Sequence, residues 1–164
     1  MTIRQIAVER LSLISSKPFA EVVANFEATI GHPDMREFGK NVSAANSWQE
    51  LEEVVQSVLG PSGFMEFARF NLGQILEKES SAKAPRILRF IVGNPLIMKQ
   101  MAEHVPDAAS YAPVTVLIDE REDGVHLSYD LMASYLASSG HLAALTVARG
   151  LDAKVEALLR AAAG

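Results

Sequence analysis

A strand-turn-strand pattern in the second half of the chain constrains the fold more than any other feature. Residues 114–118 read VTVLI, residues 125–129 read VHLSY, and the acidic segment 119–124, DEREDG, lies between them. Two β-rich runs around an Asp-Gly pair are typical of antiparallel strands joined by a tight turn. The sequence therefore predicts a hairpin here, and with it a sheet that contains antiparallel strands.

The rest of the chain alternates between strand-like and helix-like patterns. β-branched and alternating apolar residues predict strands at 6–15, 64–71 and 86–92, and apolar residues three and four positions apart predict helices at 18–30, 48–58, 72–79 and 95–104. Two more helices are expected at the carboxyl end, whereas 32–46 is expected to be irregular. Because strands return by a hairpin or one crossing helix, the predicted fold class is α+β: a two-layer, mainly antiparallel sheet with helices packed on one face.

Short polar side chains stand where several of these helices begin. Ser47, Asn71 and Asn94 each precede an apolar stripe and are predicted to cap its first N–H groups. Asp130 is predicted to cap a helix that starts near residue 131. The last helix contains Gly150, where an interruption with a new cap at Asp152 is expected.

Composition removes several classes of function. A chain of 164 residues can bury a sizeable core as one domain without disulfides or a structural metal. The absence of cysteine excludes thiolate and iron–sulfur chemistry and suits a reducing cytoplasm, the expected localisation. The net charge of −5 argues against nucleic-acid binding, which depends on clustered Lys and Arg. No apolar run has the length of a signal peptide or a membrane helix, so no membrane insertion is expected.

Four motifs occur in a fixed order across the middle of the chain: 85–90 (PRILRF), 93–95 (GNP), 112–116 (APVTV) and 124–130 (GVHLSYD). Their order and spacing resemble the bacterial family called domain of unknown function 302, DUF302. The resemblance implies a small α+β domain, usually a homodimer, with no settled biochemical role. It divides the single domain 1–164 into a family-like core at about 6–30 and 63–139, a helical insertion at about 32–60 and a carboxyl-terminal helix at about 141–163.

This chain departs from the family pattern at one polar pair. Some relatives carry Asp-His between the second strand and its following helix, where this chain has Asn71 and Leu72. A leucine has neither a proton nor a lone pair to offer. An acid–base or metal role of that histidine therefore does not transfer to this chain.

The Gly-Asn-Pro turn at 93–95 is the first candidate for ligand binding. Free N–H groups at the start of its helix, with Lys99 one turn later, can receive a carboxylate or phosphate. The same residues also suit a turn without a ligand, in which Asn94 caps the helix. We expect a small anionic ligand in a pocket between sheet and helices, with candidate binding residues Asn94, Lys99, Tyr129 and Asp130.

The residues His126, Ser128 and Asp130 have the side-chain types of a Ser-His-Asp hydrolase. On a strand they lie about 7 Å apart, however, and no Gly-x-Ser-x-Gly elbow is present. We therefore assign no catalytic residue. The alternative is a small enzyme that uses His126, Tyr129 or Asp130 for acid–base chemistry; the structural interpretation is that Tyr129 packs its ring while its hydroxyl reaches a partner.

The histidines do not predict a metal site or another cofactor. The four histidines are His32, His104, His126 and His141. No two of them have the i, i+4 spacing of a helical metal site, and the sequence has no haem-attachment motif. We therefore expect neither a metal nor another cofactor.

Bulky apolar residues occur on both faces of the predicted strands 64–71 and 86–92, and Arg86 and Arg89 fall on opposite faces. A layer of helices covers only one face of such a sheet. We therefore expect a second copy of the chain to bury part of the other face through an isologous contact. The favoured function is a non-catalytic small-molecule-binding or regulatory homodimer.

Overall fold

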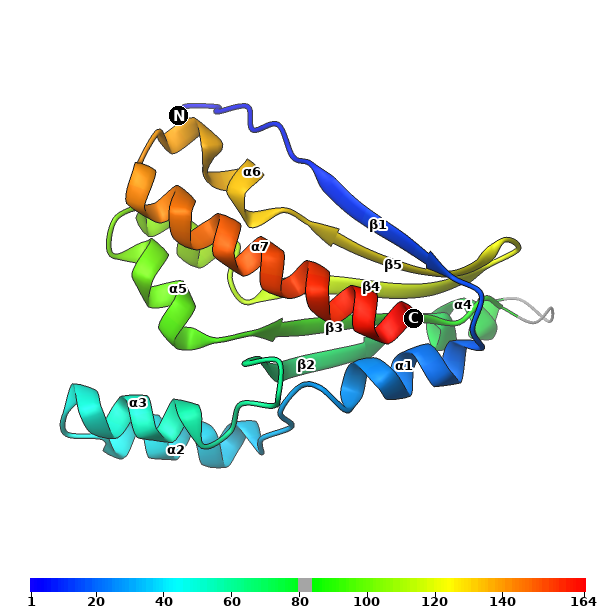
Figure 1. Cartoon of the computed structure of the whole chain (residues 1–164), viewed down its shortest axis with the longest axis horizontal. Helices are drawn as coiled ribbons and strands as arrows, with labels where there is room; N and C mark the ends of the chain where they lie inside the picture. Colours follow the sequence, from blue (N-terminus) through cyan, green and yellow to red (C-terminus); the bar gives the residue numbers. More distant parts are fainter. Residues whose placement is uncertain (80–83) are drawn as a thin grey trace.

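Five strands form one antiparallel sheet in the computed structural model, which describes residues 1–79 and 84–164 (Figure 1). The spatial order is β1-β5-β4-β3-β2, and every neighbouring pair is antiparallel. The strands are β1 (Arg10–Ser15), β2 (Met65–Asn71), β3 (Ile87–Gly93), β4 (Val114–Arg121) and β5 (Gly124–Asp130). The predicted α+β class and the central hairpin, β4 and β5, are confirmed.

Helices lie between the strands, except between β4 and β5, and form the carboxyl end of the chain. They are α1 (Phe19–Glu27), α2 (Met35–Ala44), α3 (Trp48–Gln56), α4 (Gly73–Glu79), α5 (Pro95–Ala102), α6 (Met132–Leu136) and α7 (Leu142–Ala163), with 3₁₀ turns η1 (Pro106–Ser110) and η2 (Ala137–Ser139). The longest helix, α7, crosses the sheet and contacts α1, α5 and α6 (Figure 1). Within the described residues, no helix combines the length and apolar composition needed to span a membrane.

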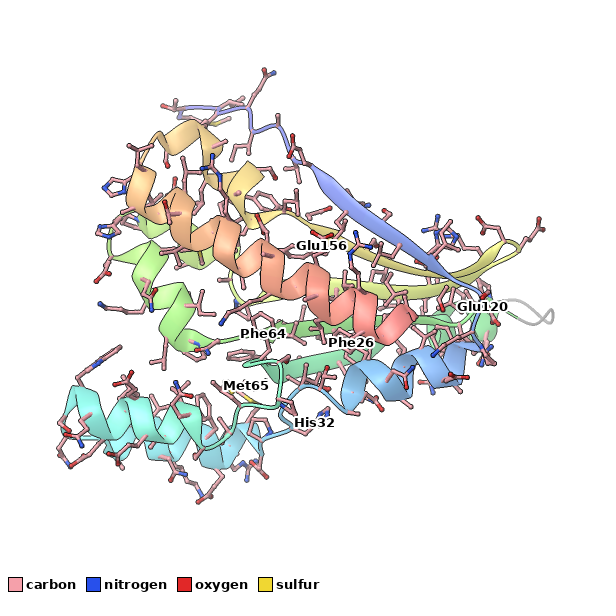
Figure 2. The ribbon with its side chains drawn as sticks, viewed as in Figure 1. Phe26, His32, Phe64, Met65, Glu120 and Glu156 are labelled. Atoms are coloured by element: carbon pink, nitrogen blue, oxygen red, sulfur yellow. The ribbon has the colours of Figure 1, made fainter. Side chains whose placement is uncertain are left out.

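The two faces of the sheet have different environments because successive side chains on a strand point to opposite sides. Side chains such as Phe90, Val116 and Leu127 point toward the helices and are fully buried. Phe26 and Phe64 lie in the same layer, between helices and sheet (Figure 2). The side chains on the other side form what we call the open face: Arg10, Ser12, Ile14, Ala68, Phe70, Ile87, Arg89, Ile91, Thr115, Leu117, Asp119, His126, Ser128 and Asp130.

The segment 32–46, expected to be irregular, contains α2. Asp34 caps this helix by accepting hydrogen bonds from the backbone N–H groups of Arg36 and Glu37, at 2.8 and 3.0 Å. Phe38 is buried in a small cluster with residues of α3, β2 and α5. The spacing of Met35, Phe38 and Val42 is helical, but Gly39 and several polar residues dilute that signal in the sequence.

The predicted caps near the carboxyl end are wrong at Asp130 and Asp152. The residue before α6, Leu131, provides no side-chain cap, and Asp130 is bonded elsewhere. The carboxylate of Asp152, in α7, accepts from the N–H groups of Met132 and Ala133 at 2.7 and 3.0 Å, and the Tyr129 hydroxyl accepts from Met132 at 3.2 Å. Helix α7 runs unbroken through Gly150. Asp152 also accepts a 2.7 Å hydrogen bond from the hydroxyl of Tyr129, so one carboxylate joins α6, α7 and β5.

Two glycines allow the α2–α3 hairpin to join the sheet. The N–H groups of Gly31 and Gly60 both donate to the carbonyl of Phe64, each at 2.9 Å. A Cβ at Gly60 would lie 2.3 Å from the carbonyl carbon of Ile30, so the two backbone segments cross without room for a side chain. His32 stands beside this crossing (Figure 2).

Replacing Asp152 with alanine should destabilise the protein by about 2–4 kcal/mol, because the buried Tyr129 hydroxyl and two N–H groups of α6 lose their acceptor. Glu156→Ala is the matched control one turn along α7 (Figure 2), where only the exposed pair with Arg160 is lost. It should change stability by less than about 0.5 kcal/mol. Urea unfolding measures both, and equal midpoints for the two variants would contradict the role given to Asp152.

Gly60→Ala should lower the free energy of unfolding by about 1–3 kcal/mol, because the added methyl group collides with backbone atoms that have no space to move. Gly39→Ala, in α2, is the control: nothing lies within 4 Å of its Cβ position. There the higher helix propensity of alanine should stabilise the protein by about 0.5–1 kcal/mol. Thermal denaturation of both variants measures the contrast, and a neutral Gly60→Ala would rule out the close crossing.

Candidate functional site

A groove of about 660 Å³ lies on the open face, at the end of the sheet where β4 begins and β5 ends. Strand side chains form its floor, and the segment 109–114 together with Tyr135 of α6 forms its sides. The lining residues are Arg10, Arg89, Ile91, Ala109, Ser110, Tyr111, Ala112, Pro113, Val114, Thr115, Leu117, Ser128, Tyr129, Asp130 and Tyr135.

Strand register brings the floor residues together. Ser128 in β5 pairs with Leu117 in β4, and Leu117 pairs with Arg89 in β3. Thr115 and Ile91 pair in the same way, two residues before Leu117 in β4 and two residues after Arg89 in β3. Because every second residue of a strand projects from the same face, these two rows form one continuous surface.

The groove has two arginines and one carboxylate on its lining. Arg10 donates two hydrogen bonds to Asp130, from Nε at 2.5 Å and from the terminal nitrogen at 2.9 Å. These bonds and the positive charge lower the pKa of Asp130, which therefore stays ionised and balanced by Arg10. Among the described residues, no carboxylate lies within 4 Å of the guanidinium of Arg89, whose central carbon lies 5.9 Å from the ring centroid of Phe70. The groove thus has a local excess of one positive charge in a chain of net charge −5.

Two tyrosines stand side by side at the rim of the groove. The rings of Tyr111, after η1, and Tyr135, in α6, are stacked with centroids 4.3 Å apart and planes 15° from parallel. The hydroxyl of Tyr135 donates a 3.4 Å hydrogen bond to Asp130. Burial, followed by the negative charge of Asp130, raises the pKa of Tyr135, which keeps its proton at neutral pH.

A second, smaller cavity of about 120 Å³ adjoins the groove at the end of β3. Its lining is mostly apolar and comes from α5, α7 and the strand ends: Phe67, Gly93, Asn94, Pro95, Ile97, Met98, Met101, Ala112, Pro113, Val114 and Leu151. Residues 112–114 line both spaces. They form a shared wall between the polar groove and the apolar cavity.

The four candidate binding residues do not meet in one place. Asp130 and Tyr129 line the groove, and Asn94 lines the cavity. Lys99 is absent from both linings; it pairs with Glu103 at 2.5 Å and lies over the ring of Trp48. The expected single pocket near all four residues is therefore not found, and a role in binding stays a prediction for each of them.

Asn94 performs the capping role proposed for it. Its side-chain oxygen accepts from the N–H of Leu96 at 2.9 Å, and its side-chain nitrogen donates to the carbonyl of Gly63 at 3.0 Å. Both polar groups of this amide are thus used within the protein, where they join α5 to the segment that leads into β2.

Tyr129 and His126 face different surroundings although they are three residues apart. The ring of Tyr129 is buried on the helix side of β5, and its burial and the nearby Asp152 carboxylate raise its pKa. His126 lies on the open face near the hairpin turn, with Nε2 2.8 Å from a carboxylate oxygen of Asp123. Four strand residues, or about 13 Å, separate His126 from Asp130. These side chains do not form a proton relay.

Sequence reasoning missed most of the groove. The sequence predicts Arg86 and Arg89 on opposite faces, and the structure confirms this: Arg86 pairs with Glu120, and Arg89 lies on the open face. No pattern in the sequence joined Arg10 to Asp130, or Tyr111 to Tyr135. In residues 1–79 and 84–164, no three metal-ligating side chains converge, and His104 and His141 stack on one another with ring centroids 4.7 Å apart.

Comparisons with known proteins agree with the architecture. The chain is similar over 93% of its length, and over 97% of the other chain, to the crystal structure of an uncharacterized conserved DUF302 protein from Bacillus stearothermophilus, with a TM-score of 0.65 and 11% identity. At that identity the likeness concerns the fold alone. No curated protein gives a significant match. The family model of the domain of unknown function DUF302 matches residues 38–162, three quarters of the sequence. The chain therefore belongs to the DUF302 family.

Proposed function

We propose that this protein is a non-catalytic small-molecule-binding or regulatory homodimer, which binds a small organic anion in the groove of the open face. The observation that carries the proposal is Arg89, a guanidinium in the groove without a carboxylate partner among the described residues. An arginine in this situation presents several N–H donors in a fork that matches a carboxylate or phosphate.

The remaining lining suits an organic ligand better than an inorganic ion. Ile91 and Leu117 provide apolar floor on either side of Arg89, while the hydroxyls of Thr115 and Ser128 can orient a polar group. The groove thus combines apolar contact surface with polar groups that can fix the orientation of a ligand. The groove volume of about 660 Å³ lies within the usual range for such sites.

The protonation states near the groove support binding rather than proton transfer. The raised pKa of Tyr129 keeps its hydroxyl protonated and bonded to Asp152, and the lowered pKa of Asp130 keeps it ionised. A general acid or base works best with a pKa near the working pH. Both shifts move away from neutrality, which favours structural roles for these two groups.

The proposed homodimer contact is centred at the end of the open face that is remote from the groove. Ile14 in β1 and Phe70 in β2 are 57% and 47% exposed, and Ile87 lies on the same side of β3. Such side chains on an uncovered sheet face suit an isologous contact with a second copy. Ile14 lies at the end of β1 remote from Arg10, so a contact centred on β1 would leave the groove accessible, whereas Phe70 lies next to Arg89 at the border of the groove.

Arg89→Gln should weaken the binding of a short carboxylate such as hexanoate by between about tenfold and 100-fold, because a charge-assisted hydrogen-bond pair is lost. Arg121→Gln is the control, since Arg121 is an exposed arginine near the hairpin turn and is paired with Asp119. Isothermal titration calorimetry on both variants measures the effect. Equal affinities for Arg89→Gln and the parent chain, or no binding of carboxylates to the parent chain, would refute the proposed site.

The parent chain should elute as a dimer in size-exclusion chromatography with light scattering, and Ile14→Glu should shift it to the monomer by placing a charge in the contact. Leu142→Glu, at an exposed site at the start of α7, should leave the dimer intact. Because the side chains of Ile14 and Leu142 are both exposed, neither substitution disturbs the core. A monomeric parent chain at micromolar concentration would end the dimer proposal.

A further inference from the structure

We propose that the bound anion is an aliphatic carboxylate whose charged end lies at Arg89 and whose chain enters the apolar cavity beside the groove. The inference rests on the proposed function, because it assumes that carboxylates bind in the groove. It adds the chemical class of the ligand and a second part of the site.

The cavity has the size and lining of a site for an apolar group. Its volume of about 120 Å³ is close to that of apolar cavities, about 150 Å³, that stay free of water and take up benzene. Met98 and Met101 contribute flexible thioether side chains, which adapt to the shape of an apolar guest. The one polar side chain in the lining, Asn94, already uses its amide in two hydrogen bonds within the protein.

The groove and the cavity lie one after the other along strand β3. Arg89, Ile91 and Gly93 occupy alternate positions of β3 and share the open face. Arg89 and Ile91 line the groove, and Gly93 lines the cavity. Four residues of strand place Gly93 about 13 Å from Arg89, a distance that a medium-length chain and the arginine side chain can cover together.

The lining becomes less polar from Arg89 in the groove toward the cavity at Gly93. The guanidinium of Arg89 stands at one end, Ile91 and Leu117 supply apolar floor beside it, and the cavity at the other end has a mostly apolar lining. Pro113 and its neighbours border both spaces, so the groove and the cavity meet at this wall. A ligand with a carboxylate at one end and hydrocarbon at the other matches this order of charge and polarity.

Gly93 lies beside the wall that separates the groove from the cavity. A Cβ at this position would lie 3.1 Å from Cβ of Pro113 and 3.6 Å from the ring of Phe67. Any side chain here would therefore press on the wall between groove and cavity. With hydrogen alone at Gly93, the wall residue Pro113 can pack directly on β3 beside the cavity.

The test is calorimetric titration of the full chain with straight-chain carboxylates from butyrate to dodecanoate. Affinity should rise about fourfold for each added methylene while the chain fills the cavity, and then level off. Decanol, which has the chain without the charge, should bind at least tenfold more weakly than decanoate. A flat response to chain length would overturn the inference, as would equal binding of decanol.

Met98→Phe is the matching variant, because it places a larger side chain in the cavity at a partly exposed position. It should abolish the rise with chain length and leave the affinity for butyrate unchanged. Met35→Phe, in the separate cluster of α2, should behave as the parent chain does. Loss of chain-length dependence in both variants, or in neither, would overturn the inference.

Methyl resonances of ¹³C-methionine give a readout that needs no variant. Decanoate should shift the signals of Met98 and Met101, whereas butyrate should not, and Met132, buried elsewhere in the core, should stay in place. Unmoved Met98 and Met101 signals at saturating decanoate would refute the cavity as a binding site. If short carboxylates bind through Arg89 while the chain-length effect is absent, only the inference fails; if no carboxylate binds, the proposed function fails with it.

Discussion

The alternation of side chains across the five-stranded antiparallel sheet is the constraint on which the other features of this protein depend. One set of alternate positions, with Phe90, Val116 and Leu127, builds the core beneath α1 and α7. The other set, with Arg89, Leu117 and Ser128, builds the floor of the groove. A shift of one residue in the register of β4 would turn Leu117 toward the core and Val116 toward the groove, so the same pairing that stabilises the fold also places the candidate site.

Asp152 also links the stability of the fold to the geometry of the groove. This carboxylate holds the first N–H groups of α6 and the hydroxyl of Tyr129, which ties a five-residue helix to the sheet and to α7. A helix of that length has little stability of its own. Because Tyr135 lies in α6, the position of the tyrosine pair at the groove rim depends on a side chain that does not itself line the groove.

The charges of the groove account for the ligand that we propose. Arg10 and Asp130 neutralise one another across β1 and β5, which leaves Arg89 as the source of the local positive charge. In a chain of net charge −5 this positive charge is confined to the groove, and the ligand that we propose is small enough to enter the groove beside the tyrosines. The DUF302 family shares the fold, whereas the ligand depends on side chains of the open face, which the fold alone does not specify.

Local patterns in the sequence determined the hairpin of β4 and β5 and the start of α5 at Asn94, because each depends on residues a few positions apart. The order of such patterns along the chain indicated the α+β class and the resemblance to DUF302. The same reasoning failed at Asp130, which the chain places directly before α6 but which the sheet places beside Arg10, 120 residues away. It failed at Asp152 for the same reason, since its partners lie some 20 residues distant. Strand order and helix packing alone decide which remote side chains become neighbours, and so only the tertiary structure brought together the groove, its rim of tyrosines and the adjoining cavity.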